Sequence, residues 1–222
     1  MYINKITGSE STSYIGGNPA IPQGASIPKS PNGSLMSFYF TLQFPEAHAL
    51  YGSTLSVFAA TDDFNEDHTI PEMLKGPLLG AALPDNFLRD YQKYFAAFLF
   101  KNGEKFYAND YPIRIAMTPL AFSHSKGSNV FGWAGDKPNW LMDDETPGQY
   151  RGAALDFLLQ ICGGQSFPII DTAPAQQEMD IFGGSKSRIK RNYTLFNQNE
   201  VYFFGAGTED LDDRVYIVTQ CH

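Results

Sequence analysis

The segment FGWAGDKPNWLMDDETPGQYRGAALDFLLQIC, Phe131–Cys162, contains both tryptophans of the chain and repeats the pattern of an earlier segment. Adding 119 to each residue number of Gly16–Leu42 aligns the two segments without a gap. We interpret this match as an internal duplication, with a first repeat unit at residues 1–122 and a second at 123–222 that together form one compact body. The identical residues are Gly16 and Gly135, Pro19 and Pro138, Pro28 and Pro147, Gly33 and Gly152, and Phe38 and Phe157.

The composition is that of a folded, acidic, globular protein. Of the 222 residues, 43% are hydrophobic and 14% aromatic, which is enough to build a core and is not typical of a disordered chain. The net charge of −8 and a pI of about 4.9 argue against nucleic-acid binding, which needs a basic surface. The two cysteines show neither a disulfide framework nor the Cys/His spacing of a zinc site.

The N-terminal residues lack the apolar core of a secretory signal, and no stretch reaches the length that a membrane span requires. We therefore expect a soluble cytoplasmic protein without a membrane partner. The oligomeric state is left open.

Alternating apolar side chains predict several strands. Leu35–Phe44 has a fully apolar face at every second residue, and Thr54–Ala60 alternates in the same way. Ala153–Ile161 fits a strand or a helix, and we favour a strand because its counterpart in the first repeat reads as one. Asn199–Gly205 matches Thr54–Ala60 at an offset of 146, so the second repeat carries 27 additional residues between its two strands. Arg214–Gln220 is predicted as a final strand.

One main buried helix is predicted at residues 86–100. Its apolar residues recur at i, i+3 and i+4, Asp85 or Asn86 can cap its start, and Gly103 can end it. Tyr111–Met117 reads as a strand, and the small and polar residues 118–130 read as a hinge between the repeats. The fold class predicted from these elements is α+β and β-rich, with two similar β units and this one helix.

Clusters of acidic residues in the loops are the main candidates for a site. Paired carboxylates can act in acid–base catalysis, but in Gly- and Pro-rich loops they are more typical of solvated turns. An EF-hand pattern beginning at Asp63 fails, because His68 and Leu74 stand where glycine and glutamate are needed. We therefore expect no metal and no cofactor. The clusters comprise Asp62, Asp63, Glu66 and Asp67, then Asp143, Asp144 and Glu145, and then Glu209, Asp210, Asp212 and Asp213.

Other potentially reactive residues have structural interpretations. Cys162 ends a predicted buried strand and is expected to be an inert core thiol. Lys186, Arg188, Lys190 and Arg191 could bind phosphate, but a solvated strand edge is favoured. Trp133 and Trp140 either pin their loop to the sheet, as Tyr14 and Ile21 would in the first repeat, or contact a partner. No nucleophile elbow, dinucleotide fingerprint or P-loop is present in the sequence.

The paired loop–strand motifs and an aromatic strand near the C-terminus make the chain similar to the YwqG-like family of bacterial proteins. This resemblance implies a β-rich, internally duplicated α+β fold without known catalytic residues. It also suggests a role as the neutralising partner of a secreted bacterial toxin. The residues that carry the resemblance are Gly16, Gly17, Pro19, Gly33, Phe38, Gly135, Pro138, Trp140, Asp143, Gly152, Leu155, Phe157, Gln160, Val201–Phe204 and Gln220.

The favoured functional hypothesis is a non-enzymatic, cytoplasmic protein–protein interaction module, such as an immunity protein that blocks a toxin. Its acidic loops would attract a basic protein partner. The alternative is an enzyme or a small-ligand-binding protein that uses a cleft between the two repeats, with Asp143, Asp62 and His68 as first candidates. A structural or regulatory domain is a third option. The partner-binding residues expected are Asp62, Asp63, Glu66, Asp67, Trp140, Asp143, Asp144 and Glu145.

Overall fold

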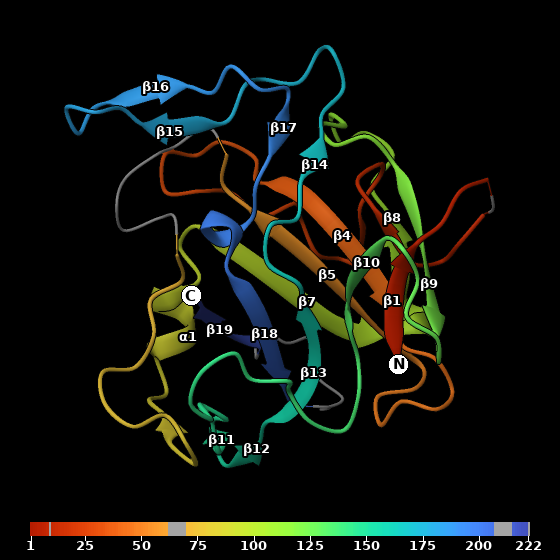
Figure 1. Cartoon of the computed structure of the whole chain (residues 1–222), viewed down its shortest axis with the longest axis vertical. Helices are drawn as coiled ribbons and strands as arrows, with labels where there is room; N and C mark the ends of the chain where they lie inside the picture. The colour runs from red at the N-terminus through yellow and green to blue at the C-terminus, as the bar shows by residue number, and fades with distance from the viewer. Residues whose placement is uncertain (9, 62–69, 207–214, 222) are drawn as a thin grey trace.

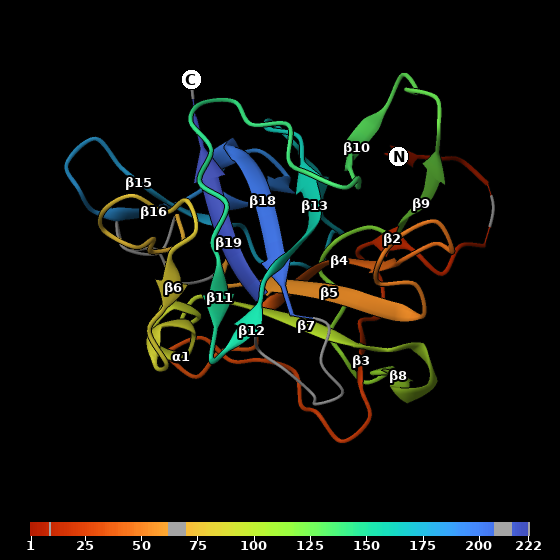
Figure 2. The ribbon, with the colours of Figure 1, turned by 90° about the horizontal axis from the view of Figure 1, so that it is seen from below.

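The central element is a ten-stranded sheet in which every neighbouring pair of strands is antiparallel (Figures 1 and 2). The computed structural model describes residues 1–8, 10–61, 70–206 and 215–221. The strand order is β19-β18-β13-β10-β1-β9-β2-β4-β5-β7. In chain order these strands are β1 (Tyr2–Lys5), β2 (Tyr14–Ile15), β4 (Ser37–Gln43), β5 (Ser53–Ala59), β7 (Phe95–Lys101), β9 (Thr118–Ser123), β10 (Val130–Trp133), β13 (Asp156–Ile161), β18 (Glu200–Gly205) and β19 (Val215–Gln220).

This sheet curls into a nearly closed barrel, so that its two end strands, β7 and β19, approach each other. Side chains that precede β7 bond to the backbone of β19. The Tyr91 hydroxyl donates to the carbonyl of Ile217 and accepts a hydrogen bond from the Ile217 amide at 2.9 Å. Gln92 Nε2 donates to the carbonyl of Val215 at 3.0 Å. These bonds satisfy backbone groups of an edge strand that would otherwise be left unpaired.

Two sets of four strands share one pairing order, β2-β4-β5-β7 and β10-β13-β18-β19. The register between β4 and β5 shifts between Phe38 and Phe40, and that between β13 and β18 shifts between Phe157 and Leu159. These irregularities lie 119 residues apart, so the sequence alignment also holds for this local feature. The division of the chain at 122/123 stays a prediction, and that position lies inside β9.

The short strands β1 and β9 form the centre of the sheet. Ile3 pairs with Phe122 on one side and with Gly132 on the other. Strand β1 thus lies between β9 and β10, whereas β9 lies between β1 and β2. Residues 118–130, expected as a hinge, therefore include a central strand and the start of another.

The α+β fold class with a main helix at residues 86–100 is wrong. The one α-helix in the described part of the chain is α1 (Phe87–Tyr91), and Phe95–Lys101 is strand β7. The spacing of Phe95, Phe98 and Leu99 fits a helix, but alternation buries Phe95, Ala97 and Leu99 just as well. Aromatic residues favour a sheet, and pairing with β5 gives this segment a complete ladder.

Most other strand predictions are confirmed. Leu35–Phe44 contains β4, and Thr54–Ala60 overlaps all of β5 except Ser53, while Asn199–Gly205 and Arg214–Gln220 contain β18 and β19. The ambiguous segment 153–161 is also extended, as β12 (Ala153–Ala154) and β13. Tyr111–Met117 is not a strand and makes only an isolated bridge from Ile115 to Ile169.

Smaller sheets and turns cover the barrel. Strands β6 (Ala82–Leu83), β11 (Gln149–Tyr150) and β12 form one sheet, and the others are strand pairs. These pairs are β3 (Ala20–Pro22) with β8 (Lys105–Tyr107), β14 (Phe167–Pro168) with β17 (Asn192–Tyr193), and β15 (Gln177–Met179) with β16 (Ser185–Ser187). In the described part of the chain, short turns of 3₁₀ type lie at η2 (Asn102–Glu104) and η3 (Phe196–Gln198).

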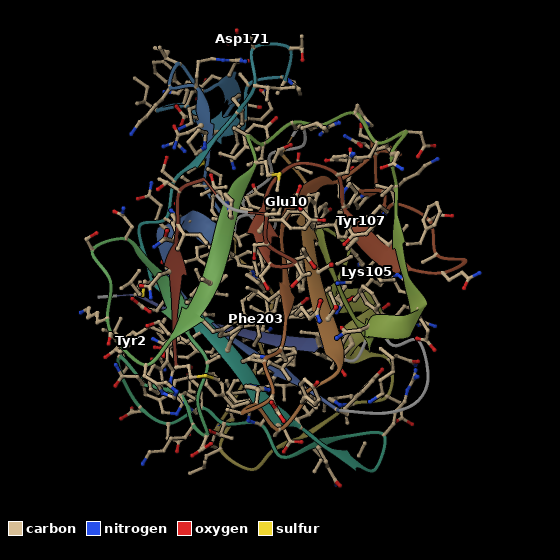
Figure 3. The ribbon with its side chains drawn as sticks, turned by 90° about the vertical axis from the view of Figure 1, so that its right-hand side faces the viewer. Tyr2, Glu10, Lys105, Tyr107, Asp171 and Phe203 are labelled. Carbon is tan, nitrogen blue, oxygen red and sulfur yellow. The ribbon has the colours of Figure 1, made fainter. Side chains whose placement is uncertain are left out.

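The core inside the barrel is aromatic. Phe40 of β4 packs edge-on against Phe131 of β10 and Phe203 of β18, two strands that lie on the other side of the central pair in the strand order. Figure 3 places Phe203 in the middle of the body. Gly132 allows β10 to lie close to β13, because a Cβ there would come within 2.2 Å of the carbonyl oxygen of Gln160. No helix among the described residues is long and apolar enough to span a membrane.

Candidate functional site

The acidic loop, residues 140–145, is held against the barrel by Gln220 of β19. Gln220 Oε1 accepts hydrogen bonds from the amides of Leu141 (3.1 Å) and Met142 (2.9 Å). Its Nε2 donates to the carbonyl of Asp143 (2.9 Å) and to the carboxylate of Glu145 (3.0 Å). A buried amide that is fully used in this way fixes the loop backbone in one conformation.

Aromatic and amide side chains of β13 and β18 hold the start of this loop. The Trp140 ring lies 4.3 Å from that of Tyr202 and 5.9 Å from that of Phe204. The Tyr202 hydroxyl accepts a hydrogen bond from the Leu141 amide, and Gln160 Oε1 accepts one from Asn139. Trp140 therefore pins the loop to the sheet and offers only part of its surface to a partner.

The three acids of the loop have different roles. Asp144 accepts hydrogen bonds from the hydroxyl (2.6 Å) and the amide (2.9 Å) of Thr146, which hold the pKa of its carboxyl below the ordinary value. Glu145 bonds to Gln220, as described above. Asp143 is exposed, and so is its neighbour Met142, whose side chain is 63% exposed. The face that the acidic loop offers to solvent is therefore centred on Met142, Asp143 and Asp144.

The remaining expected acidic residues cannot be placed beside this loop. Asp62, Asp63, Glu66 and Asp67 lie outside the described residues, as do His68 and the acids of 209–213. Within the described ranges, no three His, Cys, Asp or Glu side chains are close enough together to hold a metal ion.

His48 and Cys162 lie in surroundings that do not favour catalysis. His48 stacks on Phe44, its Nδ1 accepts a hydrogen bond from Leu50, and its Nε2 lies 3.1 Å from the Leu158 carbonyl. Burial lowers the pKa of His48, so the ring is neutral at pH 7. Burial, with a smaller contribution from Glu200, raises the pKa of the Cys162 thiol, which disfavours the thiolate that a nucleophile needs.

A hairpin formed by β15 and β16 projects from the body (Figure 1). It lies in the connection between β13 and β18, where the alignment places the 27 additional residues of the second repeat. Its turn exposes Ile181 (88%) and Phe182 (89%), and Ile189 beyond β16 is 97% exposed. The signal in the sequence is the apolar pair Ile181-Phe182 directly before two glycines, where a turn puts side chains into solvent.

The basic cluster lies on and beyond this hairpin, but it is not a free cationic patch. Arg191 donates hydrogen bonds to the carbonyls of Ile170 (2.6 Å), Asp171 (2.9 Å) and Ala173 (3.1 Å). Its guanidinium therefore holds the backbone of residues 170–173 and is used within the chain. Lys186 lies 3.7 Å from Glu178. Lys190 is exposed without a partner in the part of the chain that the structure describes.

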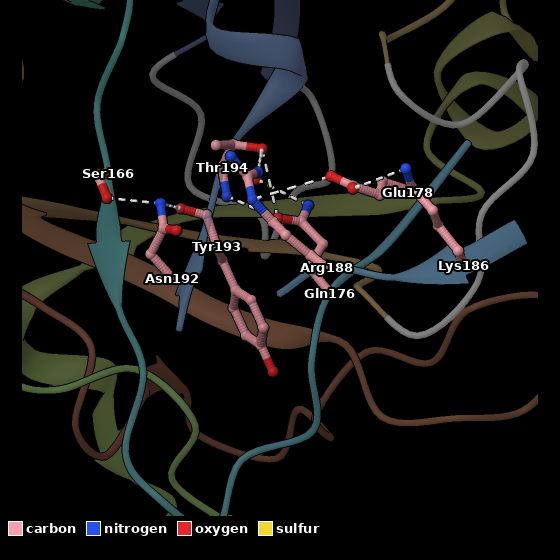
Figure 4. Close-up of polar contacts among 8 residues, drawn as sticks. All are labelled: Ser166, Gln176, Glu178, Lys186, Arg188, Asn192, Tyr193 and Thr194. Carbon is pink, nitrogen blue, oxygen red and sulfur yellow. Dashed lines mark hydrogen bonds and ion pairs between the residues drawn. The ribbon is translucent and has the colours of Figure 1, made fainter. Parts of the chain in front are cut away.

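Arg188 belongs to a polar network at the base of the hairpin (Figure 4). Its Nη1 donates to the Thr194 hydroxyl at 3.2 Å. Gln176 holds Thr194 in place, because its Oε1 accepts a hydrogen bond from the Thr194 amide (2.8 Å) and its Nε2 donates one to the Thr194 carbonyl (3.2 Å). The Tyr39 hydroxyl donates to the same carbonyl from inside the barrel. The network thus joins the hairpin to β4.

No protein-family model matches this chain, and comparison with curated proteins finds no relative. The resemblance to the YwqG-like family therefore rests on the motif residues alone and stays a prediction. Function must be argued from the acidic loop, the hairpin and the network at its base.

Proposed function

We propose that this chain is a non-enzymatic protein-binding module that contacts its partner through the tip of the β15–β16 hairpin. The observation that carries the proposal is the almost complete exposure of Ile181 and Phe182 at a point that projects from the body. Large apolar side chains that are exposed together are typical of interaction sites. Burying both in a partner would contribute about 3–6 kcal/mol, or roughly a hundred- to ten-thousandfold in affinity.

The tip is preorganised for such a contact. Asp180 Oδ1 accepts hydrogen bonds from the amides of Phe182 (2.7 Å) and Gly184 (2.8 Å). The Asp180 amide also donates to the Gly184 carbonyl at 2.7 Å. A turn fixed in this way loses little conformational freedom on binding, which favours affinity.

The acidic loop supplies a second, electrostatic surface. Asp143 and Asp144 are exposed beside Met142 on a backbone that Gln220 fixes. Carboxylates at the rim of an interface speed the approach of a basic protein more than they hold it. A toxin neutralised in the cytoplasm, as the family resemblance suggests, is one partner of this kind.

A capture experiment with single-residue variants tests the proposal. The chain is immobilised, and proteins retained from its native host are compared for the wild type, Phe182→Asp and the control Leu79→Asp, which also changes an exposed apolar residue. We expect the same partner with the wild type and Leu79→Asp, and its loss with Phe182→Asp. Equal retention by all three would refute a contact at the hairpin tip.

Salt dependence separates the two surfaces. Contact through the apolar tip should survive high salt, whereas the contribution of the acidic loop should be screened. We expect Asp143→Asn to slow association at low salt and to leave the dissociation rate almost unchanged. A partner lost at high salt from the wild type would shift the main contact from the hairpin to the acidic loop.

A further inference from the structure

A cavity of about 350 Å³ lies between the hairpin and the barrel. Tyr39, Ala59 and Ala60 line it from the side of β4 and β5, and Arg188 and the η3 turn line it from the other side. Its volume lies in the range of small-ligand sites. Its walls come from both halves of the chain, but Asp143 is not among the lining residues.

Arg188 is the more buried of the two charged residues that line this cavity. Its side chain is only 19% exposed, and the Glu178 carboxylate lies 4.0 Å from its Nε, beyond hydrogen-bonding distance. The described residues give its guanidinium one hydrogen bond, to Thr194. A cation that is largely removed from water calls for an anion at close range, and the planar guanidinium matches a carboxylate best.

Glu178 does not prevent such a ligand from binding. It also lies 3.7 Å from Lys186, so it keeps a cationic neighbour if Arg188 turns to a ligand. The exchange would replace a distant ion pair by hydrogen bonds and leave no charge unpaired.

The η3 turn, which also lines this cavity, has an unusual backbone. Phe196, Asn197 and Gln198 follow one another in the left-handed region, with φ of 46°, 53° and 68°. Residues other than glycine seldom adopt this conformation, and it is concentrated at ligand sites. Asn197 and Gln198 both line the cavity and are exposed, and their side-chain amides make no hydrogen bond within the described residues.

We propose that this cavity binds the carboxylate of a small ligand, with Arg188 as the anchoring cation and the amides of Asn197 and Gln198 as further hydrogen-bonding groups. The carboxylate can belong to a free organic acid or to the C-terminus of a peptide. Both sources present the same planar anion to the guanidinium. The site is separate from the hairpin tip, so it does not depend on the proposed protein contact.

The test is calorimetric titration of the full chain with succinate, and with an acetylated tri-alanine peptide that has a free or an amidated C-terminus. We expect binding of a free carboxylate and none of the amide. Arg188→Gln should weaken binding at least about tenfold, because a charge-assisted bond is lost. Lys190→Gln removes the same charge from an exposed residue that does not line the cavity, and should change affinity less than about twofold.

Succinate binding without peptide binding would assign the site to organic acids, and the reverse would assign it to peptide termini. If Arg188→Gln does not fold, NMR of the wild type decides, since succinate should shift the amide signals of Thr194 and Asn197. Absence of binding to the wild type at millimolar probe, equal affinity of the two variants, or shifts confined to other residues would each overturn the proposal. Phe182→Asp should bind the probes like the wild type, which separates this site from the hairpin contact.

Discussion

Tyr91→Phe tests how the barrel is closed, because it deletes the hydroxyl oxygen that bonds α1 to Ile217 of β19. The hydroxyl donates to the Ile217 carbonyl and accepts from the Ile217 amide, and both residues are buried. Burial raises the pKa of Tyr91 well above its ordinary value, so the hydroxyl is protonated at neutral pH and can do both. Phenylalanine keeps the ring and its stacking on Tyr216.

The cost follows from the groups left behind. Two hydrogen bonds are lost, and a buried amide and a buried carbonyl of Ile217 are left without a partner, which together should lower the free energy of unfolding by about 2–4 kcal/mol. Domains of this size are typically stable by about 5–15 kcal/mol, so the variant should still fold.

Equilibrium unfolding in urea, followed by tryptophan fluorescence, measures this loss. The midpoint should fall while the m-value stays the same, since the barrel exposes the same surface on unfolding. Tyr51→Phe is the control, because Tyr51 is exposed and its hydroxyl makes no hydrogen bond within the described chain. A loss below about 0.5 kcal/mol for Tyr91→Phe would refute the reasoning, because surface changes of that size are routine. It would mean that the backbone of Ile217 is satisfied in another way.

Three further changes test the acidic loop, the left-handed turn and the buried histidine. Gln220→Leu should lower the free energy of unfolding by about 2–3 kcal/mol and speed amide exchange at Met142. The control Gln149→Leu, at an exposed strand residue, should change stability by less than about 0.5 kcal/mol. Equal effects of the two variants would show that Gln220 does not fix the acidic loop. Gln198→Gly should raise stability by about 0.5–1 kcal/mol in a thermal melt, because relief of a left-handed φ of 68° outweighs the flexibility of glycine, and a loss of stability would show that the turn is not strained. Because burial lowers the pKa of His48, the unfolded chain takes up a proton first as the pH falls through about 6.5, so stability should decrease between about pH 7.5 and pH 5.5. His48→Gln should flatten this dependence and His124→Gln, at an exposed position, should not; the same slope in both variants would assign it to other groups.

Local patterns in the sequence were sufficient for the strands whose alternation is clear, such as β4 and β5. They failed at residues 86–100, because the aromatic residues there are dense enough to fit both the helical and the strand period. Only the pairing with β5 decides in favour of a strand. They also failed for β9, which was predicted as part of a hinge, because its pairing partners β1 and β2 lie about a hundred residues away along the chain.

The candidate site was visible only in part for the same reason. The acids of 143–145 stand out in the sequence, but the residue that fixes them is Gln220, and nothing local connects the two. A glutamine at the end of an apolar strand is a signal of such a buried partner, and Gln160 in β13 is a second example. The exposed pair Ile181-Phe182 was overlooked because its segment reads as a Gly- and Pro-rich loop.

The central position of β1 has a consequence for folding during synthesis on the ribosome. Tyr2–Lys5 leaves the exit tunnel before the other strands of the sheet, yet its pairing residues, 120–123 and 130–133, are made more than a hundred residues later. At about 5–20 residues per second, the first strand waits roughly 6–25 s for its neighbours. During that time the finished strands β4, β5 and β7 form a sheet with an open edge, which is the kind of surface that nascent-chain chaperones cover. Translation speed between β7 and β10 should therefore affect the yield of native protein more than speed elsewhere.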